Sequence, residues 1–199
     1  AFMKTPAAAR ELAELLVRLS ASLGIKASAL VTDMDAALGS AIGNALEVRE
    51  SVAFLRGEPV PADLAEVATD VAVRLLELHG VSDPAGSVRR ALDSGAGYEK
   101  FAEFVAAQGG DVDALVDLPV SSSVRVVSAP AGGFVAAFDA LGVAQGALEL
   151  GAGRQTKEDT LDLGAGVELL VRVGDEVSAG DPVARLYGTR SVDRATALV

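Results

Sequence analysis

The sequence has no cysteine and a single histidine, His79. The lack of thiols excludes disulfides, thiolate zinc sites, iron–sulfur clusters and a cysteine nucleophile. One imidazole cannot build a multi-histidine metal centre, and any Ser-His-Asp arrangement would have to use His79. Because Gly80 follows it at the end of a helical pattern, we interpret His79 as a residue that interacts with the last carbonyls of a helix.

Positive charge and long apolar runs are also scarce. The 199 residues carry 17 Lys and Arg against 28 Asp and Glu, and this formal net charge of −11 would on average repel nucleic acid and anionic membranes. Although 50% of the residues are hydrophobic, the apolar runs fall well short of the roughly 18 residues that a membrane-spanning helix needs. We therefore expect neither nucleic acid nor a membrane as a partner. Since Ala1–Thr5 does not have the pattern of a signal peptide, we expect a cytoplasmic location.

Residues 1–118 have the pattern of a mostly helical region around one strand. Stretches with apolar residues at helical spacing begin at Pro6, Asn44, Pro61, Pro84 and near Tyr98. Asn44 with Glu47 predicts a capping box, and the apolar segment Lys26–Thr32 predicts a short buried strand. One strand cannot form a sheet, because its backbone groups need partners. We therefore expect residues 1–118 to be the C-terminal part of a larger α/β domain with a mixed sheet, or to complete a sheet with another polypeptide.

A second domain is predicted at residues 119–199, because the composition changes after Asp111 and the run 118–123 is typical of a linker. Its pattern is α+β, with strands at Val124–Ser128, Phe134–Phe138, Val167–Val173 and Pro182–Tyr187 and a helix at Ala140–Leu150. The turns within residues 129–135 and 171–184 resemble the two arms of a biotinyl/lipoyl-type barrel-sandwich. No lysine follows Lys157, so we expect the shape of a carrier domain without its prosthetic group. The predicted fold class is thus α/β plus α+β.

Two loops are candidates for chemistry. Gly151–Arg154 lacks the Walker lysine pattern, so we favour an ordinary glycine turn over a phosphate loop. The charged run 154–159 predicts a solvated turn, with a latch between domains as the alternative. Asp33 and Asp35 follow the predicted strand and could bind a cation, but capping is the favoured interpretation.

Several short motifs occur in order along the chain. They are Ala1–Thr5, Thr32–Met34, Gly43–Glu50, Ala107–Gly110, Gly151–Arg154 and Lys157–Asp159. Together they resemble the thymidine phosphorylase and pyrimidine-nucleoside phosphorylase family over essentially the whole chain. The resemblance implies a homodimeric enzyme that transfers the pentosyl group of a pyrimidine nucleoside to phosphate, its co-substrate, without an organic cofactor.

The resemblance also implies that the helical domain, the phosphate loop and the residues that hold the pyrimidine in this family precede the point matching Ala1. No catalytic or substrate-binding residue can therefore be assigned in this sequence. We expect a C-terminal fragment that is inactive alone. The alternative is a non-catalytic binding or assembly module that completes its sheet with another chain.

One family site has matching positions, a structural potassium ion. The resemblance implies that Leu38 and Ala41 contribute backbone carbonyls and Glu50 a carboxylate, with the remaining ligands outside this sequence. The resemblance further implies that the C-terminal domain packs against the α/β domain and lines one side of the cleft that closes over substrate. We therefore expect Arg154 or Lys157 to act as a domain-closure latch.

Overall fold

Helices dominate the first part of the chain and antiparallel strands the last part, in a computed structural model that describes residues 3–199. The helices are α1 (Pro6–Ser22), α2 (Asn44–Leu55), α3 (Ala62–Leu78), α4 (Pro84–Asp93), α5 (Ala96–Ala107), the 3-10 helix η1 (Asp113–Val116), α6 (Ala140–Leu150) and α7 (Val192–Leu198). The strands are β1 (Ala41–Ile42), β2 (Val124–Ser128), β3 (Gly133–Phe134), β4 (Gly166–Leu169), β5 (Glu176–Val177) and β6 (Pro182–Tyr187). Within residues 3–199 no helix is long and apolar enough to cross a membrane.

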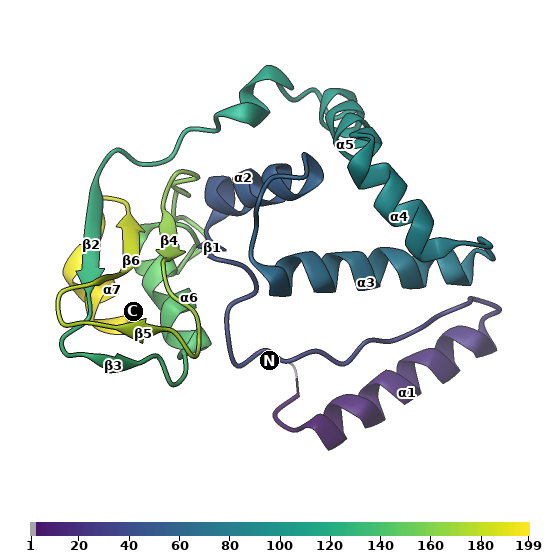
Figure 1. Cartoon of the computed structure of the whole chain (residues 1–199), viewed down its shortest axis with the longest axis horizontal. Coiled ribbons are helices and arrows are strands. Elements are labelled where there is room, and N and C mark those ends of the chain that lie inside the picture. Colours follow the sequence, from purple (N-terminus) through teal and green to yellow (C-terminus); the bar gives the residue numbers. More distant parts are fainter. Residues whose placement is uncertain (1–2) are drawn as a thin grey trace.

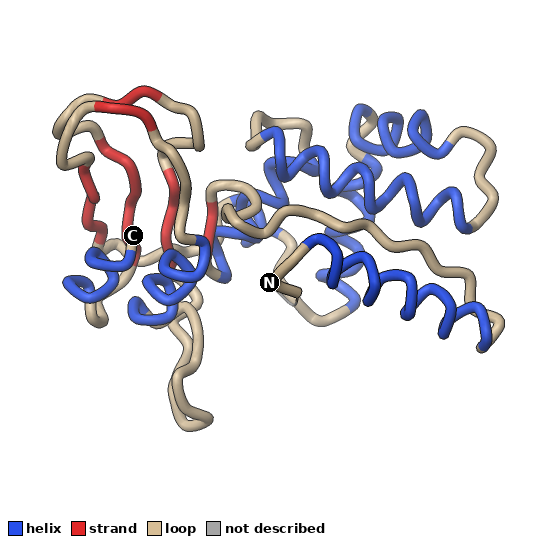
Figure 2. The backbone as a smooth tube through the Cα atoms, turned by 90° about the horizontal axis from the view of Figure 1, so that it is seen from below, coloured by secondary structure: helices blue, strands red, loops and turns tan. Residues whose placement is uncertain are grey.

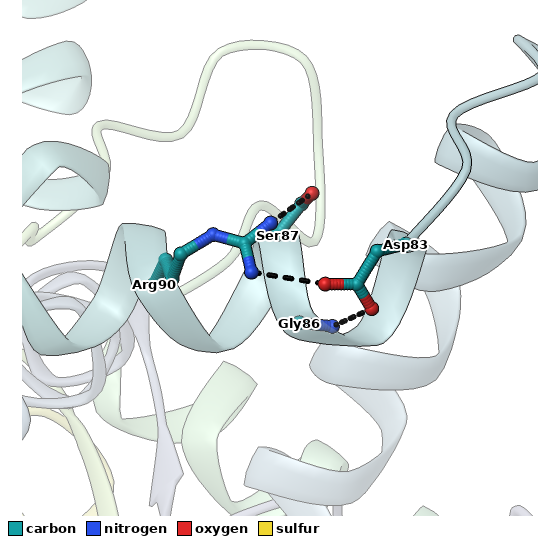
Figure 3. Close-up of polar contacts among 4 residues, drawn as sticks. All are labelled: Asp83, Gly86, Ser87 and Arg90. Carbon is teal, nitrogen blue, oxygen red and sulfur yellow. Dashed lines mark hydrogen bonds and ion pairs between the residues drawn. The ribbon is translucent and has the colours of Figure 1, made fainter.

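The five predicted helices of the first part are confirmed, and local capping explains where two of them begin. The Thr5 hydroxyl accepts a hydrogen bond from the Ala8 N–H, and proline occupies the first turn of α1. At α4, Asp83 accepts from the Gly86 N–H and also pairs with Arg90 at 2.9 Å (Figure 3). Figure 2 shows these helices at one end of the molecule and the strands at the other.

The predicted strand Lys26–Thr32 is wrong. This segment has no regular secondary structure and is exposed apart from the half-buried Ala27. It runs between α1 and α3 (Figure 1). The apolar run was the signal for a strand, but no second strand among residues 3–199 lies beside it to take its N–H and C=O groups.

The C-terminal part contains a four-stranded antiparallel sheet in the order β1-β4-β6-β2, and β3 pairs with β5. Together with the helices this is an α+β fold. β1 comes from the helical part of the chain and pairs Ala41 with Glu168 and Ile42 with Val167 (Figure 1). The domain boundary between residues 118 and 119 stays a prediction. β1 precedes this boundary in the sequence and pairs with β4, which follows it.

The core lies between this sheet and the helices α6 and α7. Its most deeply buried side chains are Leu150, Val167 and Leu186, each less than 2% exposed. Burial of such a side chain contributes about 1.5–3 kcal/mol, so this cluster is the main source of stability in the C-terminal part. By contrast, α1 has no buried residue.

Two predicted strands are longer in the sequence pattern than in the structure. The predicted strand 134–138 is formed only at Gly133–Phe134, because the chain turns toward Asp139, the N-cap of α6. The predicted strand 167–173 ends at Leu169, because the Asp175 N–H donates to the Arg172 carbonyl and closes a turn. The predictions for α6, β2 and β6 are confirmed at both ends, whereas β1, β5 and α7 were not predicted.

Candidate functional site

The two ends of the 38–41 segment, Leu38 and Ala41, lie at the wall of a cleft of about 970 Å³. Leu38, Ala41 and Glu50, the three residues expected to bind potassium, all line this cleft. Leu38 precedes β1, Ala41 begins β1, and Glu50 comes from the middle of α2. The structure therefore brings the three positions together, although they are spread over two elements and a loop.

Two carboxylates hold the 38–41 segment from the helical side. Glu50 Oε1 accepts hydrogen bonds from the Ser40 N–H at 2.8 Å and from the Ser40 hydroxyl. Asp63 of α3 accepts from the Gly39 N–H at 3.1 Å. Gly39 is buried with φ at +73°, and a Cβ here would collide with the Glu50 carboxylate. Glycine is therefore required for Glu50 to approach the loop.

The C-terminal sheet holds the same segment from the other side. Arg172 Nη1 donates to the Gly39 carbonyl at 2.7 Å, and the Leu169 N–H donates to the Ser40 carbonyl at 2.8 Å. The second bond makes Ala41 and Glu168 a non-hydrogen-bonded pair of the β1–β4 ladder. The Ala41 carbonyl is consequently directed away from β4.

The carbonyl oxygens of Leu38 and Ala41 and the Glu50 carboxylate are suitable ligands for a hard monovalent cation. Within residues 3–199 the Leu38 carbonyl and Glu50 Oε2 accept no hydrogen bond, so both oxygens are free to act as ligands. Carbonyl and carboxylate oxygens are the ligands that hard cations prefer. The described chain has no group of three or more His, Cys, Asp and Glu residues that could hold a metal, so backbone carbonyls have to complete such a site. The ligand set itself stays a prediction.

A polar cluster lies on β4 and β6, next to β1. Glu168 Oε2 accepts hydrogen bonds from Tyr187 Oη at 2.8 Å and from Arg185 Nη1 at 3.0 Å. Burial, and then the hydrogen bond to Glu168, raises the pKa of the Tyr187 hydroxyl. Tyr187 therefore stays a hydrogen-bond donor at neutral pH and links β6 to β4 beside the 38–41 segment.

The N-terminus of α2 differs from the predicted capping box. The N-cap is Gly43 rather than Asn44, and Glu47 Oε1 accepts from the Gly43 N–H at 2.9 Å. Position 43 requires glycine, because the Cβ of any other residue would lie 2.5 Å from the Ala165 carbonyl oxygen. Asn44 is thereby left to donate from Nδ2 to the Ala152 carbonyl at 2.8 Å.

Arg154 and Lys157 lie in the loop between α6 and β4, and both are exposed. Asp159 orders the loop by accepting from the Thr156 N–H, the Thr156 hydroxyl and the Gln155 N–H, and these bonds lower the pKa of Asp159. No ion pair or side-chain hydrogen bond joins Arg154 or Lys157 to another described residue. The domain-closure latch therefore stays a prediction, and the Arg154 and Lys157 side chains are both available for it.

The interpretation of His79 is confirmed, whereas Asp33 caps a turn and not a helix, because no helix begins between Ser22 and Asn44. Asp33 Oδ1 accepts from the Asp35 N–H at 2.8 Å and caps a turn. His79 lies at the end of α3, with Nδ1 2.9 Å from the Leu75 carbonyl oxygen. Neither observation indicates catalysis.

Known phosphorylases resemble this chain along its whole length. Residues 134–199 match the family model described as "Pyrimidine nucleoside phosphorylase C-terminal domain". The chain is 41% identical to "Pyrimidine-nucleoside phosphorylase" of Bacillus subtilis (strain 168), in an alignment that covers 100% of this chain and 48% of that protein. Residues 134–199 thus have the sequence of this C-terminal domain, and the whole chain is similar to one part of these phosphorylases.

Other relatives give the same result. The chain is 40% identical to "Thymidine phosphorylase" of Mycobacterium tuberculosis, over 94% of this chain and 43% of that protein. It is 36% identical to "Pyrimidine-nucleoside phosphorylase" of Geobacillus stearothermophilus, over 96% of this chain and 45% of that protein. The chain thus spans about half the length of the curated phosphorylases it matches.

Sequence reasoning missed the residues that hold the 38–41 segment in place. Ser40, Asp63 and Arg172 all bond to the 38–41 segment or to Glu50. A bond between residues 133 apart, as for Arg172 and Gly39, has no local sequence signal. Asp63 lies in the first turn of α3, where acidic residues are common, so nothing in the local sequence marks it.

Proposed function

We propose that this chain is one part of a pyrimidine-nucleoside phosphorylase. The reaction transfers the pentosyl group of a pyrimidine nucleoside to phosphate, giving the free base and a pentose 1-phosphate. The observation that carries the proposal is the similarity to these enzymes along the whole chain. The alternative, a non-catalytic assembly module, is not favoured because no part of the chain departs from that similarity.

The 38–41 segment would contribute to catalysis by holding a potassium ion. The Leu38 and Ala41 carbonyls and the Glu50 carboxylate are the ligands that this chain supplies. When bound, the ion supplies a fixed positive charge near an anionic co-substrate. Glu50 has a second task, because its other oxygen accepts the hydrogen bonds from Ser40. Loss of this carboxylate would therefore release the loop as well as the ion.

The finer fold and the domain movement are further parts of the proposal. Residues 1–118 would be the C-terminal part of an α/β domain, and 119–199 a barrel-sandwich-like domain. The exposed Arg154 or Lys157 would close the substrate cleft by pairing with an acidic group. Substituting each with alanine in an intact homologue should raise the KM for the nucleoside, and unchanged turnover and affinity would remove the latch.

Phosphate and pyrimidine binding are assigned to segments outside these 199 residues. The support is that the chain matches only about half of the length of its relatives. The 199 residues alone are therefore expected to have no phosphorolytic activity.

The assignment of phosphate and pyrimidine binding to other segments can be tested with the folded 199-residue chain. The assay is release of thymine from thymidine in potassium buffer, with and without phosphate. We expect no release under either condition. Phosphate-dependent release would mean that a complete site exists within these residues, unless it disappears after a second purification that removes other proteins.

A further inference from the structure

Four consecutive carbonyls of the 38–41 segment fall into two classes. The middle two, of Gly39 and Ser40, are occupied by hydrogen bonds from Arg172 Nη1 and the Leu169 N–H. The outer two, of Leu38 and Ala41, are the cation ligands under the proposed function. The C-terminal sheet therefore determines which carbonyls of the loop remain available to a cation.

The two bonds to the sheet differ in kind. The Leu169 N–H belongs to the backbone next to the β1–β4 ladder and comes with the pairing of these strands. Arg172 is the one described side chain after residue 118 that bonds to the 38–41 segment. A hydrogen bond from a guanidinium is charge-assisted and about twice as strong as a neutral one.

Arg172 is itself held in place. Its N–H donates to Asp175 Oδ2 at 2.7 Å, and the Asp175 N–H donates back to the Arg172 carbonyl at 3.1 Å. This tight turn at the end of β4 fixes the backbone from which the half-buried side chain extends. The guanidinium therefore reaches Gly39 from a rigid support.

Opposite charges hold the loop from its two sides. Glu50 accepts from Ser40 on the α2 side, and Arg172 donates to Gly39 on the β4 side. The pair orients the peptide between Gly39 and Ser40, and the orientation of this peptide limits that of the flanking carbonyls. A carbonyl that accepts from a guanidinium is also a poor ligand for a second cation.

We propose that Arg172 is a positioning residue of the cation site. It binds the Gly39 carbonyl, and so keeps the Leu38 and Ala41 carbonyls directed at the ion and couples the ion to the C-terminal sheet. This inference rests on the proposed function, because it requires the 38–41 segment to hold a cation.

Hydrogen–deuterium exchange tests it in a chimera in which this chain replaces the matching C-terminal part of the Bacillus subtilis relative, so that the remaining ligands are present. Exchange is compared in potassium chloride and in tetramethylammonium chloride at equal ionic strength, and the chimera without a substitution serves as the wild type. In the wild type, potassium should slow exchange in the peptide that covers residues 38–42. Arg172→Ala should speed exchange there about tenfold, as expected for loss of one charge-assisted hydrogen bond, and should abolish the effect of potassium. Arg172→Lys, which keeps one donor, should restore part of that effect.

Arg194→Ala is the matched control, since Arg194 is an exposed arginine of α7 that pairs with Glu149, away from the loop. It should leave the potassium effect unchanged. If Arg172→Ala keeps the wild-type response to potassium, or speeds exchange equally in α6, Arg172 is not a positioning residue. If the wild-type loop itself does not respond to potassium, the cation site of the proposed function is wrong for this chain, and the inference is rejected with it.

Discussion

The Asn44 side chain donates a hydrogen bond from Nδ2 to the Ala152 carbonyl at 2.8 Å, across 108 positions of the sequence. It connects the first turn of α2 to the loop that carries Arg154 and Lys157. Because the bond is exposed, Asn44→Ala should lower the free energy of unfolding by about 0.5–1 kcal/mol. The measurement is urea denaturation.

Ser51→Ala is the control for this bond. The Ser51 hydroxyl donates to the Glu47 carbonyl within α2, so its loss should leave stability almost unchanged. If the two variants have the same stability, the contact between Asn44 and Ala152 contributes nothing to the folded state.

Close backbone packing between β1 and β4 predicts a large effect at Gly166. A Cβ at this position would collide with the Ile42 carbonyl oxygen and lie 2.8 Å from Leu46 Cδ1. Gly166→Ala should therefore destabilise the chain by about 2–3 kcal/mol, because backbone cannot move aside as a flexible side chain does.

Gly97→Ala provides the opposite case. Gly97 lies in α5, where a Cβ would make ordinary contact at 3.4 Å with Leu55 Cδ2. Alanine there should be neutral or stabilise by up to about 1 kcal/mol, because it restricts the unfolded chain. Equal urea midpoints for Gly166→Ala and Gly97→Ala would contradict the close contact of β1 with β4.

The Asp83 carboxylate predicts a pH dependence of stability. The hydrogen bond from Arg90, and then that from the Gly86 N–H, lowers the pKa of Asp83 below 3.8 (Figure 3). Because the folded pKa is the lower one, the ionised carboxylate stabilises the fold at pH values above 3.8, and this contribution is lost as the pH falls through the folded pKa.

Asp83→Asn keeps an N-cap acceptor and removes the charge. Its urea midpoint should lie below that of the wild type at neutral pH, and the two should converge in acid, at the pH where the Asp83 carboxylate of the folded chain is protonated. Arg90→Ala should reduce the pH dependence in the same way. A difference between wild type and Asp83→Asn that stays constant down to that pH would show that the ion pair does not affect stability.

Elements with local signals could be predicted from the sequence. Asp139 caps α6, and the prediction Ala140–Leu150 matches its bounds. The apolar Lys26–Thr32 carries the signal of a strand, but strand formation depends on a neighbour that no local pattern reveals. β1 has only two residues and no periodicity, and its pairing with Val167 and Glu168 joins positions more than 120 apart.

The candidate site shows the same difference between what local sequence patterns indicate and what only long-range contacts determine. Leu38, Ala41 and Glu50 were reached through family resemblance, and the structure places them around one cleft. Asp63 and Arg172 hold the 38–41 segment in place. Their contacts depend on the tertiary arrangement of α3 and of the turn that follows β4. Only the folded chain could identify them.

The most direct test of the account is a chimera in which this chain replaces the matching C-terminal part of the Bacillus subtilis relative. The measurement is release of thymine from thymidine. We predict phosphate-dependent release by the folded chimera and its loss, without unfolding, in the Glu50→Gln variant. A folded chimera that releases no thymine would contradict the claim that these 199 residues form part of a pyrimidine-nucleoside phosphorylase site.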